Sequence, residues 1–281
     1  MNINRTTMTT TIPRVNYSSN DINLSVVVGL VLRVNYSTNQ EIATIRQVNR
    51  ELNDVLRNTY NFQEFIPINI VIAMTQNNKN RVNKVIIEDI TQLDLINTHN
   101  IQYFRELAFD QYFNQPLATG VFPTSITSLT FGRYFNQPLV AGVFPTSLTS
   151  LTFGYKFNQP LVENVLPIGL TSLTFGSKFN QPLVENVLLI GLTSLTFGFR
   201  FNQPLLENVL PISLTSLTFG ALFDQLLVEN VLPASLKLLT FGSYFDQPLG
   251  AGVLPAGLKT LIFDSNYDQK FVSSVKPIYV L

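Results

Sequence analysis

The strongest constraint on this chain is a 22-residue repeat that runs from residue 107 to the end without insertion or deletion. Each copy reads close to LTSLTFGxxFNQPLxxxVLPxS. A fixed period of about 20 to 30 residues is typical of a solenoid, whose coils bury an apolar face only by stacking on their neighbours. Such regularity argues against a catalytic pocket, which needs loops of unequal length. One aromatic residue recurs in each of about eight expected coils, at Phe113, Phe135, Phe157, Phe179, Phe201, Phe223, Phe245 and Tyr267.

A single copy already shows how a coil is built. Residues 150–153 alternate polar and apolar side chains, which predicts a short strand with one face buried. Gly154 ends the strand, Phe157 returns to the core, and residues 158–160 (Asn-Gln-Pro) are expected to form a turn. We therefore expect a parallel sheet with one strand per coil and short irregular structure on the opposite side. Further core contacts are expected from Leu161, Val165 and Leu166.

The first hundred residues differ from the repeats. Residues 1–20 are rich in Thr, Asn and Ser and are expected to form a flexible tail. Residues 21–66 place apolar side chains three and four positions apart, which predicts a helical module. Residues 67–106 should serve as connector and N-terminal cap, because the apolar residues 85–87 lie one repeat before the first strand. The repeat array itself covers residues 107–281, so the expected fold class is α+β.

Composition narrows the classes of function. The formal net charge is zero, with 18 basic and 18 acidic residues, which argues against binding to nucleic acid or to an anionic membrane. There is no cysteine, so disulfides and thiolate metal sites are excluded, and a cytoplasmic location fits. The one histidine, His99, sits in a polar connector and is expected to be a solvated loop residue. We therefore expect no enzyme, no cofactor and no metal site.

Two positions just after the strand glycine vary most among the copies. Variation inside an otherwise fixed repeat indicates a surface where packing does not dictate identity, and the residues found there are types that dominate protein interfaces. We expect them to form a strip that binds an acidic or aromatic segment of a target protein. Neutral drift explains the same variation, and a platform for single-stranded nucleic acid is disfavoured by the neutral charge. The strip residues are Tyr112, Arg133, Tyr134, Tyr155, Lys156, Lys178, Phe199 and Arg200.

Two polar rows also recur at the repeat spacing. An asparagine ladder is expected to satisfy backbone groups where the coils stack; it comprises Asn114, Asn136, Asn158, Asn180 and Asn202. A glutamate row could bind a hard cation such as calcium, but a single row offers few converging oxygens, so a solvated acidic edge is favoured. This row comprises Glu163, Glu185, Glu207 and Glu229.

The motif Phe-Asn-Gln-Pro-Leu, seen first at residues 113–117, resembles the FNIP repeat, a relative of the leucine-rich repeat. The family is abundant in social amoebae and in giant viruses that infect amoebae, so a viral chain would act in the host cytoplasm. The resemblance implies a leucine-rich-repeat-like solenoid that binds proteins. Departures from the motif are few: Leu226 and Lys270 replace its proline, Leu189 replaces the later proline, and Asp224, Asp246 and Asp268 replace the asparagine.

Residues 45–56 are similar to the second half of an F-box, with Asn49 and Leu52 where that family usually has cysteine and tryptophan. The Leu-Pro opening of the F-box is missing. The resemblance implies docking on a Skp-type adaptor, and hence a substrate receptor of a cullin ubiquitin ligase. The alternative is a repeat scaffold that binds proteins without any ubiquitin role. The implied adaptor-binding residues are Ile42, Ile45, Val48, Leu52 and Val55.

Overall fold

The computed structural model describes residues 66–68, 71, 83–98, 104–264, 267 and 277–280. The chain divides into two compact units, Met1–Glu51 and Leu52–Leu281, and every described residue belongs to the second. Apart from Ile66, the predicted helical module of residues 21–66 lies outside the described residues. The predicted tail, His99 and the five implied adaptor-binding residues lie outside them as well.

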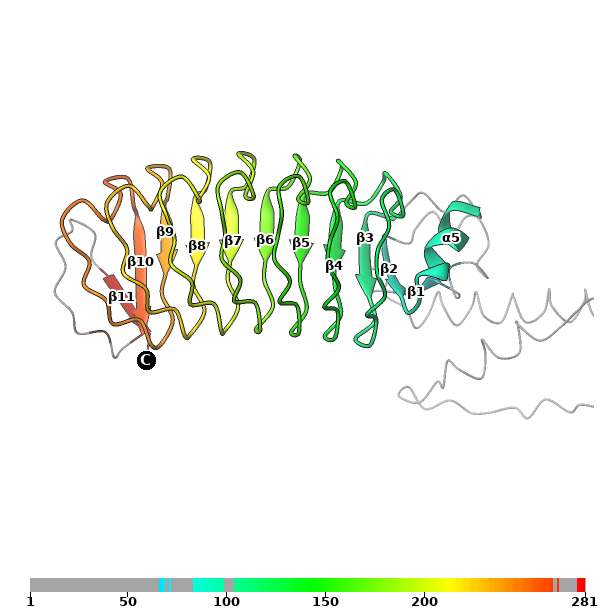
Figure 1. The fold of residues 1–281 in the computed structure, drawn as a ribbon, viewed down its shortest axis with the longest axis horizontal. Coiled ribbons are helices and arrows are strands. Elements are labelled where there is room, and N and C mark those ends of the chain that lie inside the picture. The colour runs from blue at the N-terminus through cyan, green and yellow to red at the C-terminus, as the bar shows by residue number, and fades with distance from the viewer. Residues whose placement is uncertain are drawn as a thin grey trace, which may run out of the picture. The chain divides into compact units, whose positions relative to one another are not determined.

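The described part of the chain is a parallel β-solenoid of about eight coils, as the repeat predicts (Figure 1). One sheet holds all the described strands, and each of them pairs in parallel with the next in sequence. A short helix, α5 (Thr91–Thr98), lies between the second and third strands in a stretch that we expected to be connector. The strands are β1 (Ile66–Pro67), β2 (Lys84–Ile87), β3 (Glu106–Phe109), β4 (Ser128–Thr130), β5 (Ser150–Thr152), β6 (Ser172–Thr174), β7 (Ser194–Thr196), β8 (Ser216–Thr218), β9 (Leu238–Thr240), β10 (Thr260–Asp264) and β11 (Pro277–Val280).

The register of the sheet follows the repeat. From β2 to β10, each residue pairs with the residue 22 positions later, for example Val85 with Leu107 and Leu151 with Leu173. The apolar residues 85–87 therefore do lie in register with the first full coil. The two ends depart from the period, because Ile66 pairs with Val85 and Leu261 pairs with Pro277.

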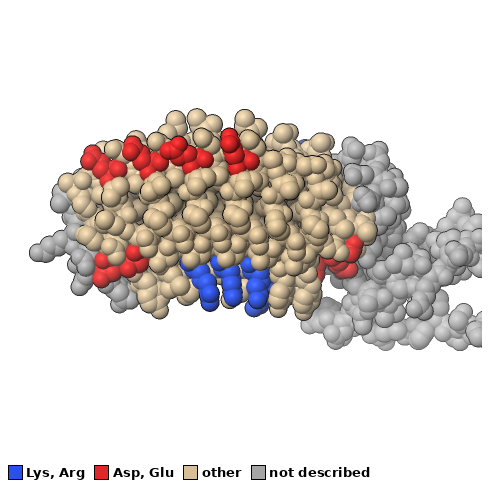
Figure 2. Space-filling model, viewed as in Figure 1, with Lys and Arg blue, Asp and Glu red and all other residues tan. Residues whose placement is uncertain are grey.

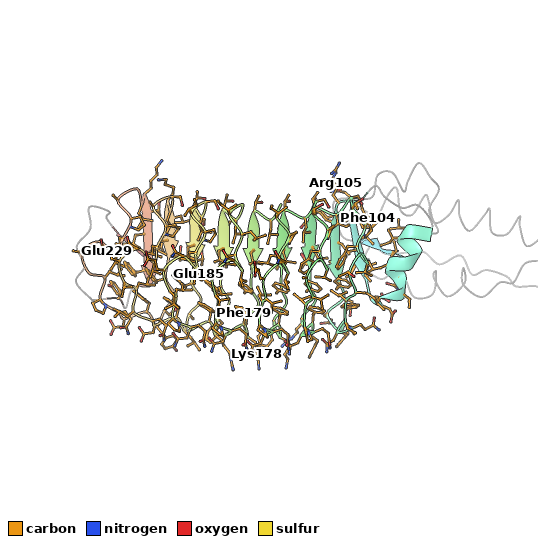
Figure 3. All side chains as sticks on the ribbon, turned by 45° about the horizontal axis from the view of Figure 1, so that its top comes forward. Phe104, Arg105, Lys178, Phe179, Glu185 and Glu229 are labelled. Atoms are coloured by element: carbon orange, nitrogen blue, oxygen red, sulfur yellow. The ribbon has the colours of Figure 1, made fainter. Side chains whose placement is uncertain are left out.

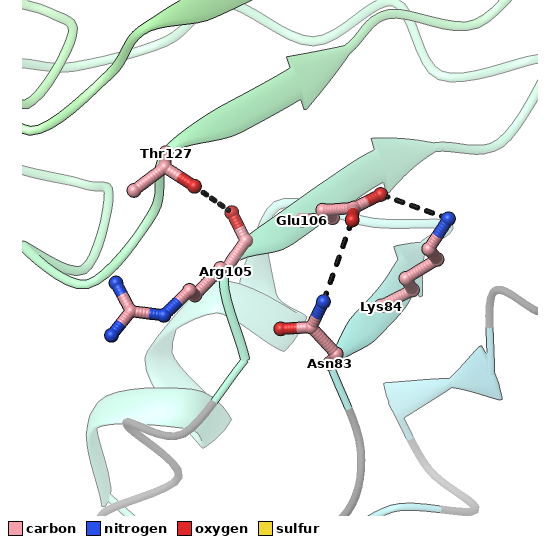
Figure 4. A network of polar contacts seen from close by, with 5 residues as sticks. All are labelled: Asn83, Lys84, Arg105, Glu106 and Thr127. Atoms are coloured by element: carbon pink, nitrogen blue, oxygen red, sulfur yellow. Dashed lines mark hydrogen bonds and ion pairs between the residues drawn. The ribbon is translucent and has the colours of Figure 1, made fainter. Parts of the chain in front are cut away.

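The N-terminal strands are joined by polar contacts as well as by the ladder (Figure 4). The Lys84 ammonium lies 3.1 Å from Glu106, and the Asn83 amide donates to the same carboxylate at 3.4 Å. The Thr127 hydroxyl donates to the Arg105 carbonyl, and the equivalent threonines repeat this bond up the stack, as Thr149 does to Thr127 at 3.0 Å. These bonds fix the starts of neighbouring strands.

The core is built from two rows of stacked phenylalanine rings. Within a coil, the ring after the strand stacks on the ring of the motif, with centroids 3.8 Å apart for Phe153 and Phe157. Between coils, the rings next to the strands are 5.2 to 5.8 Å apart and the motif rings are 6.0 to 6.2 Å apart. Paired strands are about 4.8 Å apart, so the coils fan out away from the sheet. The sheet is therefore on the inner side of a gentle curve.

In the coils of β4 to β9, hydrogen-bonded turns lie at three places, which corrects one prediction. In the coil of β5, Phe157 N–H donates to Gly154, Val165 to Val162, and Leu170 to Pro167. The predicted turn at residues 158–160 is wrong, since this segment is irregular and has no hydrogen-bonded turn. The turn comes one step earlier, at the two variable positions after the strand glycine.

A glycine is required before that turn because neighbouring coils almost touch there. A Cβ atom on Gly154 would lie 1.9 Å from the carbonyl oxygen of Gly132 in the preceding coil. The same clash, at 1.7 to 2.4 Å, recurs for each such glycine from Gly132 to Gly242. Any side chain at this position would push the coils apart. The glycine therefore lets neighbouring coils approach equally closely at this turn, and the variable pair that follows occupies the same position in each of these coils.

Candidate functional site

The polar residues of the motif join the coils in a hydrogen-bonded ladder. The Asn136 N–H donates to Asn114 Oδ1 at 2.8 Å, and the same bond recurs through Asn202 at 2.8 to 2.9 Å. The next residue, glutamine, also reaches back: Gln181 Nε2 donates to Asn158 Oδ1 at 3.2 Å. The order Phe-Asn-Gln-Pro thus supplies a core ring, an acceptor, a donor and a residue without an N–H to satisfy. The glutamine row is part of the site that sequence reasoning missed.

The aspartates that replace asparagine keep the acceptor. Asp224 Oδ1 accepts the Asp246 N–H at 3.0 Å and Gln247 Nε2 at 2.9 Å. In all these bonds the ladder side chain uses its oxygen, which aspartate also has. The substitution therefore preserves the ladder's geometry while placing charge on it.

At the N-terminal end the ladder finishes on Asp89. This carboxylate accepts the N–H and hydroxyl of Thr91, each at 2.8 Å, and Gln115 Nε2 at 2.9 Å. These bonds, the Thr91 backbone bond first, lower the pKa of Asp89 below its ordinary value by stabilising the charged form. Asp89 therefore both caps the start of α5 and accepts the first glutamine of the ladder.

The predicted strip lies on the turn that follows the strand glycine. Backbone hydrogen bonds join this turn to the same turn of the preceding coil. The Lys156 N–H donates to the Arg133 carbonyl at 2.9 Å, and the Lys178 N–H donates to the Tyr155 carbonyl at 3.0 Å. The Arg200 N–H makes the equivalent bond to Ser177 at 2.9 Å. Side chains that vary in identity are thus held on a backbone that does not vary.

The N-terminal half of the strip forms one network of rings and cations. The rings of Tyr112 and Tyr134 stack with centroids 5.6 Å apart. Arg133 lies between two rings, 5.9 Å from Tyr134 and 5.1 Å from Tyr155. Lys156 lies 5.7 Å from the Tyr134 ring. These distances fall within the range of cation–π attraction, so the structure brings these five residues together.

The network continues to Lys178, which lies 5.8 Å from the Tyr155 ring. Phe199 and Arg200 stand next along the strip, and in the described part of the chain neither has a ring or cation–π contact. Tyr112 and Phe199 remain 70% and 50% exposed. The strip therefore faces solvent. Ring and cation–π contacts connect its side chains toward the N-terminal end, and Phe199 and Arg200 lie outside this network.

The glutamate row lies at a different turn of the same coils. Figure 2 shows basic side chains along one edge of the coils and acidic side chains along the opposite edge, and Figure 3 shows Lys178 well apart from Glu185. All four glutamates are exposed. Within the described ranges, no group of three or more His, Cys, Asp or Glu residues is placed to hold a metal ion. The arrangement supports a solvated acidic edge.

Exposed aliphatic residues flank the glutamates, and sequence reasoning missed them. Val162 and Ile168 are 53% and 73% exposed, on either side of a turn whose third residue, Asn164, has a φ of 63°. Asparagine or glycine is needed at such a left-handed position. The sequence held one sign of this exposure. Among the copies, the position of Val162 holds residues that range in size from glycine to leucine, a wider range than a packed core allows. The exposed set comprises Val140, Val162, Val184, Leu206, Val228, Ile168, Ile190 and Ile212.

Comparisons with known proteins agree with this architecture. The family model described as FNIP Repeat matches residues 113–156, 157–200, 201–244 and 245–278. Among solved structures, the chain is similar to CroV588 of a giant virus, described as a novel circular LRR protein, with 41% identity and a TM-score of 0.56. The match covers 70% of this chain and 31% of that one, so the chain spans about a third of the length of this relative. No curated protein matches the chain. No helix in the described ranges is long and apolar enough to cross a bilayer.

Proposed function

This chain belongs to the FNIP repeat family, and we propose that its solenoid binds an acidic, aromatic-containing segment of a partner protein on the strip. A leucine-rich-repeat-like stack is suited to protein binding, because each coil presents the same turn to one extended surface. Beyond protein binding in general, the proposal names the strip as the binding surface and an acidic segment with aromatic residues as its ligand. It assigns no catalytic role to the chain.

The observation that carries the proposal is the cation–π network of the strip. Arg133, Lys156 and Lys178 lie against tyrosine rings and still reach solvent. A cation already positioned on a ring loses little freedom when a carboxylate binds it, and the ring faces beside it can stack on an aromatic side chain. Tyrosine and arginine are also the residue types that most often dominate binding energy.

A titration tests the proposal directly. The full chain would be added to a fluorescein-labelled peptide in which phenylalanines are spaced among glutamates, and fluorescence anisotropy would report binding. We expect the triple variant Tyr134→Ala/Lys156→Ala/Arg200→Ala to weaken binding by about tenfold or more, since each contact contributes roughly 0.5 to 1 kcal/mol at an exposed site. The matched control is Tyr244→Ala, an exposed tyrosine at the same repeat position beyond the network.

Equal affinity of the wild type and the triple variant would reject the proposed surface. A peptide with lysine in place of glutamate should not bind. Competition by a single-stranded oligothymidylate that is stronger than competition by the unlabelled peptide would instead favour the nucleic-acid alternative.

A ubiquitin-ligase role is the finer form of this proposal, and it is supported by the resemblance of residues 45–56 to an F-box. In this form, Ile42, Ile45, Val48, Leu52 and Val55 contact a Skp-type adaptor while the strip holds the target. A pull-down of the full chain with a purified Skp-type adaptor tests it. Recovery that is lost in Ile45→Asp/Leu52→Asp supports the role, and failure of the wild type to recover the adaptor leaves a protein-binding scaffold without it.

A further inference from the structure

The solenoid carries rows of opposite charge on opposite edges of the same coils (Figure 2). The basic row is Lys156, Lys178 and Arg200, one residue from each of three successive coils. Each is followed seven residues later by a glutamate of its own coil, in the glutamate row. Acidic side chains also stand on the basic edge toward both ends of the stack, so the basic stretch is confined to the middle coils (Figure 2).

We propose that copies of this chain associate side by side, with the basic row of one copy against the glutamate row of the next. The inference builds on the proposed role of the strip as a protein-binding surface and names a second copy of the chain as one partner. Because the two rows lie on different edges, a copy that is bound through one row can still bind a further copy through its other row.

The repeat itself brings the two rows into register. Both rows advance by one residue per 22-residue coil, so each cation has one glutamate counterpart in its own coil. Because the coils fan out away from the sheet, the spacing along both rows exceeds the roughly 4.8 Å between paired strands. A neighbour displaced sideways, without a shift along the stack, places Lys156 opposite Glu163, Lys178 opposite Glu185 and Arg200 opposite Glu207. Three ion pairs then form together rather than one at a time.

Neither row is neutralised inside the chain. Across the described ranges, none of the three cations and none of the four glutamates takes part in an ion pair, although Lys156 and Lys178 lie against tyrosine rings. All four glutamates face solvent. Their charges are therefore available to a neighbour.

Apolar side chains accompany both rows and would meet in the contact. Phe199 and Tyr155 are 50% and 40% exposed beside the basic row. Val162, Val184 and Leu206 are 53%, 59% and 67% exposed, each directly before a glutamate. An exposed apolar surface beside complementary charge is typical of an interaction site.

This contact joins two different surfaces, so it is heterologous and does not close with two copies. Association should therefore continue beyond a dimer as concentration rises. It should also be salt-sensitive, since the Debye length falls from about 30 Å at 0.01 M salt to about 3 Å at 1 M.

Sedimentation velocity of the full chain over a range of concentrations tests the proposal. For the wild type at low salt, we expect the weight-average mass to rise well above the 31.6 kDa monomer with concentration and to return to it at high salt. Reversal of the basic row, Lys156→Glu/Lys178→Glu/Arg200→Glu, should leave a monomer at all concentrations. Reversal of the acidic row, Glu163→Lys/Glu185→Lys/Glu207→Lys, should do the same.

The deciding variant carries both reversals together. It has zero net charge like the wild type, its two edges are complementary again, and we expect it to recover association. The matched control is Arg105→Glu/Lys237→Glu/Lys259→Glu, which makes the same change in net charge at exposed positions just before the strands. This control should associate more strongly than the basic-row reversal, and circular dichroism would verify that every variant is folded.

A monomeric wild type at low salt overturns the proposal, as does a combined reversal that stays monomeric while folded. Equal loss in the matched control would show that net charge, and not the rows, governs association. These outcomes are separate from the peptide titration, because a monomeric chain that still binds the acidic peptide through the strip retains the proposed function.

Discussion

Replacing Gly176 with alanine probes how closely the coils must approach at the turn that carries the strip. The new Cβ would lie 1.7 Å from the carbonyl oxygen of Gly154 in the preceding coil. Nonbonded heavy atoms prefer a separation of about 3.5 Å, so the two coils must part by roughly 1.5 Å or more. The obstacle is backbone, so no flexible side chain can move aside to relieve it.

The size of the effect follows from the bonds beside this contact. The Lys178 N–H donates to the Tyr155 carbonyl at 3.0 Å, and the Asn180 N–H donates to Asn158 Oδ1 at 2.8 Å. Loss of both bonds costs about 1 kcal/mol each, and forcing volume into a packed site costs about 1 to 3 kcal/mol more. We therefore expect Gly176→Ala to lower the free energy of unfolding by about 3 to 5 kcal/mol.

Urea unfolding followed by far-UV circular dichroism measures this loss. The matched control is Gly250→Ala, because a Cβ at Gly250 meets no atom within 4 Å and its backbone is not left-handed. That control should stay within about 0.5 kcal/mol of the wild type. A Gly176→Ala protein as stable as the control would refute the argument that backbone contact dictates glycine at this turn.

Other positions give further predictions. Asn158→Asp should cost less than about 1 kcal/mol, since the acceptor stays, whereas Asn158→Ala leaves two donors of the next coil without a partner and should cost about 1 to 3 kcal/mol in the same urea assay; equal losses would contradict the ladder. Asn186, at φ 64°, should tolerate glycine but lose about 1 to 2 kcal/mol on substitution by valine; a neutral valine would argue against a left-handed turn. Because the pKa of Asp89 is lowered in the folded chain, its stabilisation is present above the unfolded pKa and is lost as the pH falls through the folded one. The advantage of the wild type over Asp89→Asn in thermal unfolding should thus disappear in acid, and a difference that does not change with pH would exclude this role.

The period and the alternation of side chains were sufficient to predict the sheet, its register and the buried rings. One strand per coil, in a fixed 22-residue period, leaves a single parallel pairing that keeps Leu151 and Phe153 inside, and the structure has that pairing. The prediction holds because a slip by one residue would turn the whole apolar face toward water.

The turns could not be placed from the sequence in the same way. Asparagine and proline favour turns, so the sequence predicts one at residues 158–160, but Asn158 and Gln159 form hydrogen bonds to neighbouring coils instead. Hydrogen bonds to residues 22 positions away therefore determine the conformation of this segment more than its local turn preference does, and the sequence of a single coil does not reveal these bonds. The helix α5 was missed for a related reason, since its apolar residues Leu93 and Ile96 are too few to show a helical period.

Of the two exposed rows described above, the sequence predicted the position of the strip but not the exposed aliphatic row. Variation inside a fixed repeat pointed to the strip, and the structure holds Arg133, Tyr134 and Tyr155 together there. The exposed row of Val162 and its equivalents was missed because an apolar residue next to the core leucine is read as buried unless its coil geometry is known.

Hydrogen exchange of the full chain, with and without the glutamate–phenylalanine peptide, tests the central claim that the strip is the binding surface. The account predicts that added protection falls on the turns at residues 133–134, 155–156, 177–178 and 199–200. At a chain concentration that keeps the protein monomeric, the turns that carry Glu163 and Glu185 should exchange as before. Protection confined to the glutamate turns, or none at a peptide concentration that saturates anisotropy, would contradict it.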